Sequence, residues 1–213
     1  MKKTGQNAPE HGSTLRQPSM VACLPVTLLA LGLASPVQEV HGQVGDLGCQ
    51  VAEQMPLDDR ASPLDSASVE VSGETIKVCY GAPSARGRTM IGGEDVPYGD
   101  LWRTGANEPT MIHLSGRMEV GGLGLSAGSY SLYTIPDGEE WQVFISRSVD
   151  HWGNQIDPDV RAAEVGEFTV PREEPLEHVE TMRFRFEEAM GDAADLILEW
   201  ENYRITIPVE LVG

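Results

Sequence analysis

The sequence is short of basic and aromatic residues. Its 213 residues include 15 lysines and arginines against 33 aspartates and glutamates, and aromatic residues make up only 6% of the chain. With a net charge of −18, the protein lacks the basic face that binds nucleic acids or anionic membranes, so we expect neither as a partner of the mature domain. Screening confines surface potentials to about 8 Å at physiological salt, so a local arginine cluster can still hold a small anion.

Long helical periodicity and the common catalytic motifs are also missing. The sequence contains no Gly-x-Ser-x-Gly, no Walker loop and no dinucleotide-binding fingerprint, which disfavours the hydrolases, nucleotide-binding enzymes and redox enzymes that use them. The histidines are too widely spaced for a zinc motif, and the segment that follows His151 fits no standard calcium loop. We therefore expect no cofactor and no metal, and the sequence assigns no catalytic residue.

The N-terminal region has the pattern of an export signal. Three basic residues precede an apolar run at residues 20–34, which is too short to span a bilayer comfortably and is followed by small and polar residues. Pro25 interrupts the run and disfavours a buried N-terminal helix, while a retained anchor is a further alternative. We predict that residues 1–34 are a signal peptide and that the mature protein is periplasmic or extracellular.

Only three cysteines are present, and loss of the signal peptide would leave two of them. Cys49 lies in residues 35–66, an acidic stretch without sustained periodicity that we predict to be a linker. Cys79 lies in the domain that follows. Export permits a disulfide between the two, and a buried Cys79 with a free Cys49 fits the same spacing.

The remaining residues, 67–213, are predicted to form one β-domain. Apolar and polar residues alternate with period two in eight to ten short runs, and the 23 glycines and 14 prolines favour a turn-rich architecture. This pattern predicts an all-β, antiparallel β-sandwich, and a jelly-roll order of the same strands fits equally well. The spacing disfavours a closed barrel. The best candidate for a short helix is residues 158–164.

Residues 84–110 interrupt the alternation with a long polar loop, which we predict to be the functional site. The loop holds three arginines, one tryptophan, one tyrosine, one asparagine and four acidic residues. Arginine offers a charged fork to a carboxylate or phosphate, tryptophan offers an apolar face, and asparagine can donate and accept hydrogen bonds. We predict that the loop binds a small polar or anionic ligand through five residues: Arg88, Trp102, Arg103, Asn107 and Glu108.

Two other interpretations of the loop stay open. Its four acidic residues outnumber its three arginines, so every arginine can form an ion pair within the loop. The protein would then be a purely structural envelope domain. The second alternative is a hydrolase-like enzyme that acts on glycans or anionic esters, with Glu108 as an acid or base. The burial of Arg88 and Arg103 distinguishes the binding interpretation from the structural one. Arginine side chains that are open to a cleft favour a binding site, whereas fully buried ones favour a structural role in fixing the loop.

Several sequence runs resemble those of a known family. The most specific is Trp-Arg-Thr-Gly-Ala-Asn-Glu at residues 102–108, and further runs lie at residues 80–83, 87–93, 96–99 and 127–136. Taken together in chain order, these runs are similar to those of a bacterial family of exported proteins known only as domain of unknown function 2911, over roughly residues 60–212. The resemblance implies export and a β-rich domain, and it implies no activity.

Overall fold

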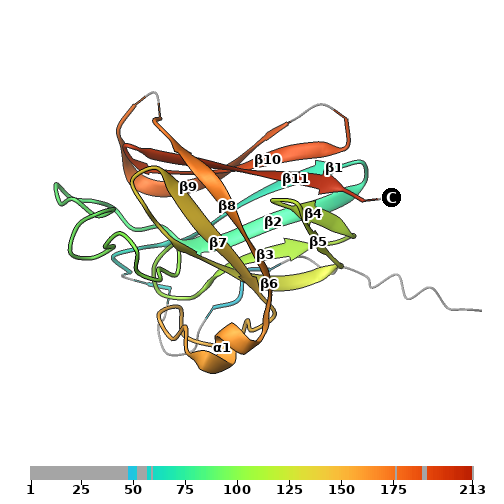
Figure 1. The fold of residues 1–213 in the computed structure, drawn as a ribbon, viewed down its shortest axis with the longest axis horizontal. Coiled ribbons are helices and arrows are strands. Elements are labelled where there is room, and N and C mark those ends of the chain that lie inside the picture. Colours follow the sequence, from blue (N-terminus) through green and yellow to red (C-terminus); the bar gives the residue numbers. More distant parts are fainter. Residues whose placement is uncertain (1–47, 52–56, 59, 176, 189–190, 213) are drawn as a thin grey trace, which may run out of the picture. The chain divides into compact units, whose positions relative to one another are not determined.

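Residues 48–51, 57–58, 60–175, 177–188 and 191–212 are described by a computed structural model (Figure 1). The predicted signal peptide, residues 1–34, and most of the predicted linker, residues 35–66, lie outside these described residues. The elements are, in chain order, β1 (Leu64–Val71), β2 (Glu74–Gly81), β3 (Thr110–Leu114), β4 (Met118–Val120), β5 (Leu123–Leu125), β6 (Gly128–Ile135), β7 (Glu140–Ser146), α1 (Pro158–Ala162), β8 (Glu164–Glu173), β9 (Val179–Glu188), β10 (Ala193–Glu201) and β11 (Tyr203–Leu211).

The strands form one antiparallel sheet. Its order is β1-β2-β3-β6-β7-β8-β11-β10-β9, with β4 paired to β11 and β5 paired to β4. Strand β8 connects the two halves of the sheet, because residues 164–171 pair with β7 whereas Arg172 and Glu173 pair with β11. A long strand with two partners thus makes the sheet continuous.

Residues that follow β2 bring the sheet close to closure. Ser84 forms an isolated bridge with Thr181 of β9. On either side of this bridge, the Ala85 N–H donates to the carbonyl of residue 180, and the N–H of residue 182 donates to the Pro83 carbonyl, both at 2.9 Å. The sheet is therefore nearly closed and barrel-like.

The predicted all-β, antiparallel fold is confirmed, whereas the predicted sandwich of two separate sheets is not. The strands instead approach the closed arrangement that the spacing disfavoured. Period-two alternation shows which face of a strand is buried, but it does not show which strand lies beside it. The double pairing of β8 and the return of residues 83–85 to β9 are backbone contacts that alternation does not encode.

Apolar side chains from all eleven strands meet in one buried core. In β2, the alternate residues Ile76, Val78 and Tyr80 are 1%, 0% and 1% exposed, as alternation predicts. Trp141 and Trp200 are among the largest fully buried side chains. Burial of a large apolar side chain contributes about 1.5–3 kcal/mol, so this core holds the sheet and the segments attached to it.

A smaller cluster lies outside this main core. Tyr133 of β6 and Phe144 of β7 stack with ring centroids 5.5 Å apart, and Val160 of α1 packs against them. Asp157 caps α1, because its carboxylate accepts hydrogen bonds from the N–H groups of Asp159 and Val160 at 3.0 Å. The predicted helical segment is thus confirmed. Within the described part of the chain, no helix has the length and hydropathy that a bilayer crossing requires.

A disulfide joins Cys49 to Cys79. Cys79 is buried in β2 between the core residues Val78 and Tyr80, and its side chain therefore lies on the opposite face of the strand from theirs. The bond fixes residues 48–51 beside the sheet, and the alternative of a free Cys49 is excluded.

Candidate functional site

Residues 84–110 cover most of the long loop that connects β2 to β3 (Figure 1). Hydrogen bonds with the sheet hold this loop in shape. The carboxylate of Glu201, at the end of β10, accepts hydrogen bonds from the N–H groups of Met90 and Ile91 at 3.0 and 2.8 Å. Further along the loop, Trp102 and Thr134 of β6 exchange two backbone hydrogen bonds of 2.8 and 2.9 Å. The loop is therefore pinned at two points about ten residues apart.

Thr104 adopts an uncommon backbone conformation at the centre of the site. Its φ of 56° lies in the left-handed region, which costs a β-branched residue roughly 1–3 kcal/mol. Its hydroxyl lies 3.0 Å from the Thr134 hydroxyl, and its carbonyl accepts a 2.7 Å hydrogen bond from the Thr110 hydroxyl. These bonds maintain the sharp bend that separates Arg103 from Gly105.

A cavity of about 490 Å³ lies against this bend, and we call it the Arg103 cavity. Trp102, Trp200, Met90 and Leu101 supply much of its apolar lining. Its polar lining includes Arg103 and the side chains of Asp95 and Asn154. A concave site that combines apolar side chains with a few polar groups is typical of small-molecule binding sites.

Arg103 is half-buried in this cavity, and burial lowers the pKa of its guanidinium group from the ordinary value. Its Nε donates a 3.1 Å hydrogen bond to the Gly105 carbonyl. Among the described residues no carboxylate lies within ion-pair distance of Arg103, and its four remaining N–H donors have no hydrogen-bond partner. Since arginine stays protonated at neutral pH, Arg103 contributes a partly desolvated positive charge that is not paired with a carboxylate of the described residues.

Trp102 forms the wall behind Arg103. Its ring stacks on Trp200 with centroids 5.7 Å apart and meets Trp141 edge-on at 6.0 Å. The side chain is only 9% exposed, so it is part of the core as well as part of the cavity lining. A ligand in this cavity therefore meets a rigid apolar surface.

The other three predicted site residues do not line the Arg103 cavity. Arg88 is exposed and pairs with Asp95 at 2.9 Å. The Nδ2 of Asn107 donates a 2.9 Å hydrogen bond to the Ser62 carbonyl. Glu108 accepts two hydrogen bonds from Arg60, at 2.7 and 2.9 Å. The structure thus brings Trp102 and Arg103 together in one cavity and places the other three residues in contacts that hold the loop.

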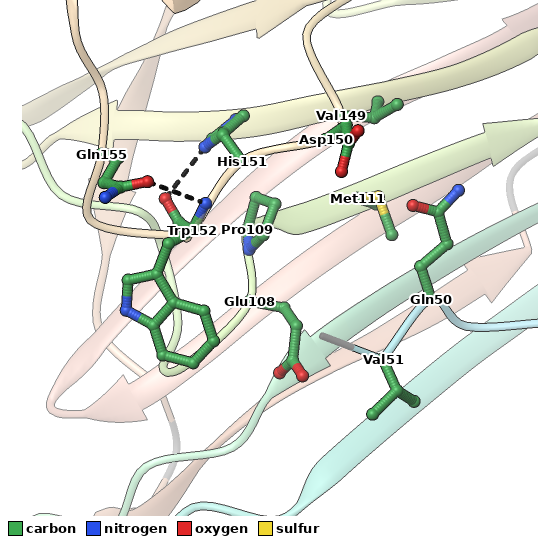
Figure 2. Close-up of a pocket in the computed structure, with 10 residues that line it drawn as sticks. All are labelled: Gln50, Val51, Glu108, Pro109, Met111, Val149, Asp150, His151, Trp152 and Gln155. Atoms are coloured by element: carbon green, nitrogen blue, oxygen red, sulfur yellow. Dashed lines mark hydrogen bonds between the residues drawn. The ribbon is translucent and has the colours of Figure 1, made fainter. Parts of the chain in front are cut away.

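A second cavity, of about 720 Å³, was not predicted from the sequence, and we call it the Asp150 cavity. Figure 2 shows that four segments surround it. Residues 50–51 lie beside the disulfide, Glu108 and Pro109 end the loop, Met111 belongs to β3, and residues 149–155 follow β7. The polar residues 150–155 are visible in the sequence, but only the disulfide and the sheet bring them opposite residues 50–51.

The fold and these cavities define an all-β, antiparallel domain with a shaped loop. The particular family is the one described as "Protein of unknown function (DUF2911)", which matches residues 62–209. The chain belongs to this family, and the resemblance inferred from the sequence runs is confirmed. No curated protein and no solved structure matches the chain significantly.

Proposed function

We propose that the protein is a binding module for a small anionic molecule and that the Arg103 cavity is its site. The observation that supports this proposal is the state of Arg103, which is half-buried, lines a cavity and has no carboxylate partner among the described residues. A half-buried charge is only partly solvated, and an anionic ligand would give its remaining N–H donors a charged partner. The planar guanidinium group suits a carboxylate or a phosphate, because it can donate two parallel hydrogen bonds.

The lining of the cavity favours a ligand with an apolar or ring-shaped body. Trp102 and Trp200, whose rings stack on each other, both contribute to the lining, and Leu101, which is 36% exposed, lies at the solvent side. Asn154 can donate and accept hydrogen bonds with ligand hydroxyl groups. A sugar acid or a ring-bearing carboxylic acid fits both the charge of Arg103 and this lining.

A purely structural domain is the second candidate function. Two ion pairs favour it, because each pairs a charged loop residue with another residue of the chain: Arg88 with Asp95, and Glu108 with Arg60. The Arg60–Glu108 pair also bears on the enzyme alternative, because both carboxylate oxygens of Glu108 accept hydrogen bonds from Arg60. A carboxylate held in this way is poorly suited to proton transfer, so we do not propose catalysis through Glu108.

We further propose that the protein is exported and works in an oxidising compartment. The disulfide between Cys49 and Cys79 supports this proposal, because such bonds persist outside the reducing cytosol. It agrees with the signal-like pattern of residues 1–34.

A thermal-shift screen tests the binding proposal. Glucuronate, benzoate, phosphate and neutral glucose would be compared as probes with the wild-type protein, Arg103→Met and Arg117→Met. Arg117 is the matched control, because it is an exposed arginine outside both cavities and has no ion pair among the described residues. A ligand that binds only the folded state raises the melting temperature, and at a hundred times its Kd it stabilises by about 2.7 kcal/mol.

We expect at least one anion to stabilise the wild type and Arg117→Met but not Arg103→Met. Glucose should have no comparable effect. If an anion still stabilises a folded Arg103→Met variant, it binds at a site other than the Arg103 cavity. If no anion stabilises the wild type, the binding proposal is wrong and the structural interpretation is favoured.

A further inference from the structure

We propose that the Asp150 cavity is a second binding site and that it takes a small organic ammonium ion. This proposal is independent of the Arg103 cavity. Figure 2 shows the side chains of Glu108, Asp150, Met111, Gln50 and Val51 around one opening, although they come from separate parts of the chain. The volume of about 720 Å³ is ample for a small molecule.

The charge of the cavity favours a cation. The described lining includes the carboxylates of Glu108 and Asp150 and no lysine or arginine. Arg60 neutralises Glu108 from outside this lining, whereas Asp150 has no ion pair within the described part of the chain. The Asp150 carboxylate is therefore not paired with a basic side chain of the described residues, and the acidic composition of the chain does not oppose a cation.

His151 adds a hydrogen-bond acceptor to this lining. Its Nδ1 lies 3.0 Å from the Trp152 carbonyl, and because a carbonyl can only accept, Nδ1 carries the proton. The Nε2 atom of the same ring is shielded from solvent and has no hydrogen-bond partner among the described residues, and in the Nδ1–H tautomer it is an acceptor. An unpaired buried acceptor costs about as much as a lost hydrogen bond, so a donor at this position is favourable.

Two more unpaired polar atoms lie on the same face of the sheet as Met111. Ser131 is directly opposite Met111 in the β3–β6 register, and His113 is two residues further along β3. The Oγ of Ser131 and the Nε2 of His113 are buried without partners, and these residues are 0% and 2% exposed. Of the five such side-chain atoms among the described residues, the Nε2 of His151 belongs to the described cavity lining, whereas Ser131 and His113 do not line the cavity.

Two groups of the described lining can accept hydrogen bonds from one ligand, namely the Asp150 carboxylate and the Nε2 atom of His151. A carboxylate and an imidazole nitrogen that accepts hydrogen bonds match a ligand group that has only donors, such as an ammonium group. The half-buried Trp152 ring adds an aromatic surface suited to the alkyl part of such a ligand or to its charge.

A metal ion fits this cavity less well than an organic cation. Among the described residues, no group of three or more histidine, cysteine, aspartate or glutamate side chains is arranged to hold a metal. The apolar side chains of Val51, Val149 and Met111 occupy positions where a metal site would need further ligands, and they suit an alkyl chain instead.

Calorimetric titration with n-butylammonium chloride at constant ionic strength tests the proposal. The neutral isostere n-butanol and calcium chloride are the comparison probes, and the variants are Asp150→Asn and His151→Phe. Asp159→Asn is the matched control, because Asp159 is an exposed aspartate of α1 that does not line the cavity. Asp150 is itself exposed, so its variant is expected to fold.

We expect n-butylammonium to bind the wild type and Asp159→Asn, and to bind Asp150→Asn about tenfold more weakly, as for the loss of one charge-assisted hydrogen bond. His151→Phe should also weaken binding, and Arg103→Met should not. Equal binding of n-butanol, equal affinity of the two aspartate variants, or no heat with the ammonium probe would overturn the proposal. Calcium binding that depends on Asp150 without ammonium binding would replace it with a metal site.

Discussion

Arg60 and Glu108 form a buried ion pair with two hydrogen bonds. Nη1 of Arg60 donates to Oε2 of Glu108 at 2.9 Å, and Nη2 donates to Oε1 at 2.7 Å. The two side chains are 1% and 5% exposed and are 48 residues apart in the sequence. The pair therefore ties the segment before β1 to the end of the 84–110 loop.

Removal of one member of this pair should destabilise the protein strongly. In Arg60→Met, the buried Glu108 carboxylate would lose both hydrogen bonds from Arg60, and the loss of one member of a buried ion pair costs about 3–5 kcal/mol. Urea unfolding of the variant and the wild type measures the difference. The double variant Arg60→Met with Glu108→Leu should lose less than Arg60→Met alone, because the buried Glu108 carboxylate is then removed together with the Arg60 guanidinium group. A loss below about 1 kcal/mol in the single variant would mean that the pair behaves like an exposed one.

The carboxylate of Glu201 should control the order of the loop near Met90. Glu201→Gln leaves one acceptor oxygen for two N–H donors, and the loss of a hydrogen bond to a charged group costs about 1.5–3 kcal/mol. Hydrogen exchange at the amides of Met90 and Ile91 should accelerate in the variant. Glu210→Gln, an exposed acid on β11, is the control and should leave both amides protected. Unchanged protection in Glu201→Gln would show that other contacts hold this turn.

The stability of the protein should fall in mild acid partly because of His113. Burial, and to a smaller extent the charge of Lys77, lowers the pKa of His113 from its ordinary value of 6.5. The unfolded chain therefore binds more protons at this residue than the folded chain, so stability is present above pH 6.5 and is lost as the pH falls below it. Unfolding free energies at about pH 7.5 and pH 5 should differ less in His113→Gln than in the wild type. An equal difference in both proteins would assign the acid sensitivity to other groups.

The sequence predicted the local structure of the domain better than its closure. Alternation in β2 and the short pattern that became α1 depend on neighbouring residues, and both are found in the structure. The sandwich was not confirmed because strand order depends on contacts between distant segments. The pairing of β8 with both β7 and β11 cannot be recognised from the alternation of apolar and polar residues in β8.

The candidate site shows the same division. A tryptophan beside an arginine in a polar loop was enough to select Trp102 and Arg103, and both line one cavity. The composition of the loop could not show which arginine has no ion pair with a carboxylate. Glu108, for example, pairs with Arg60, which lies outside the loop. The Asp150 cavity was missed because its walls come from segments that only the folded sheet and the disulfide bring together.

The bridge between Ser84 and Thr181 has a consequence for the order in which the domain can be built. These residues are 97 positions apart, so the contact cannot form until β9 has been synthesised. Contacts of such long range slow folding, since a large loop must close before they form. The sheet can therefore approach closure only after most of the chain has left the ribosome, although β1, β2 and β3 can pair with one another earlier.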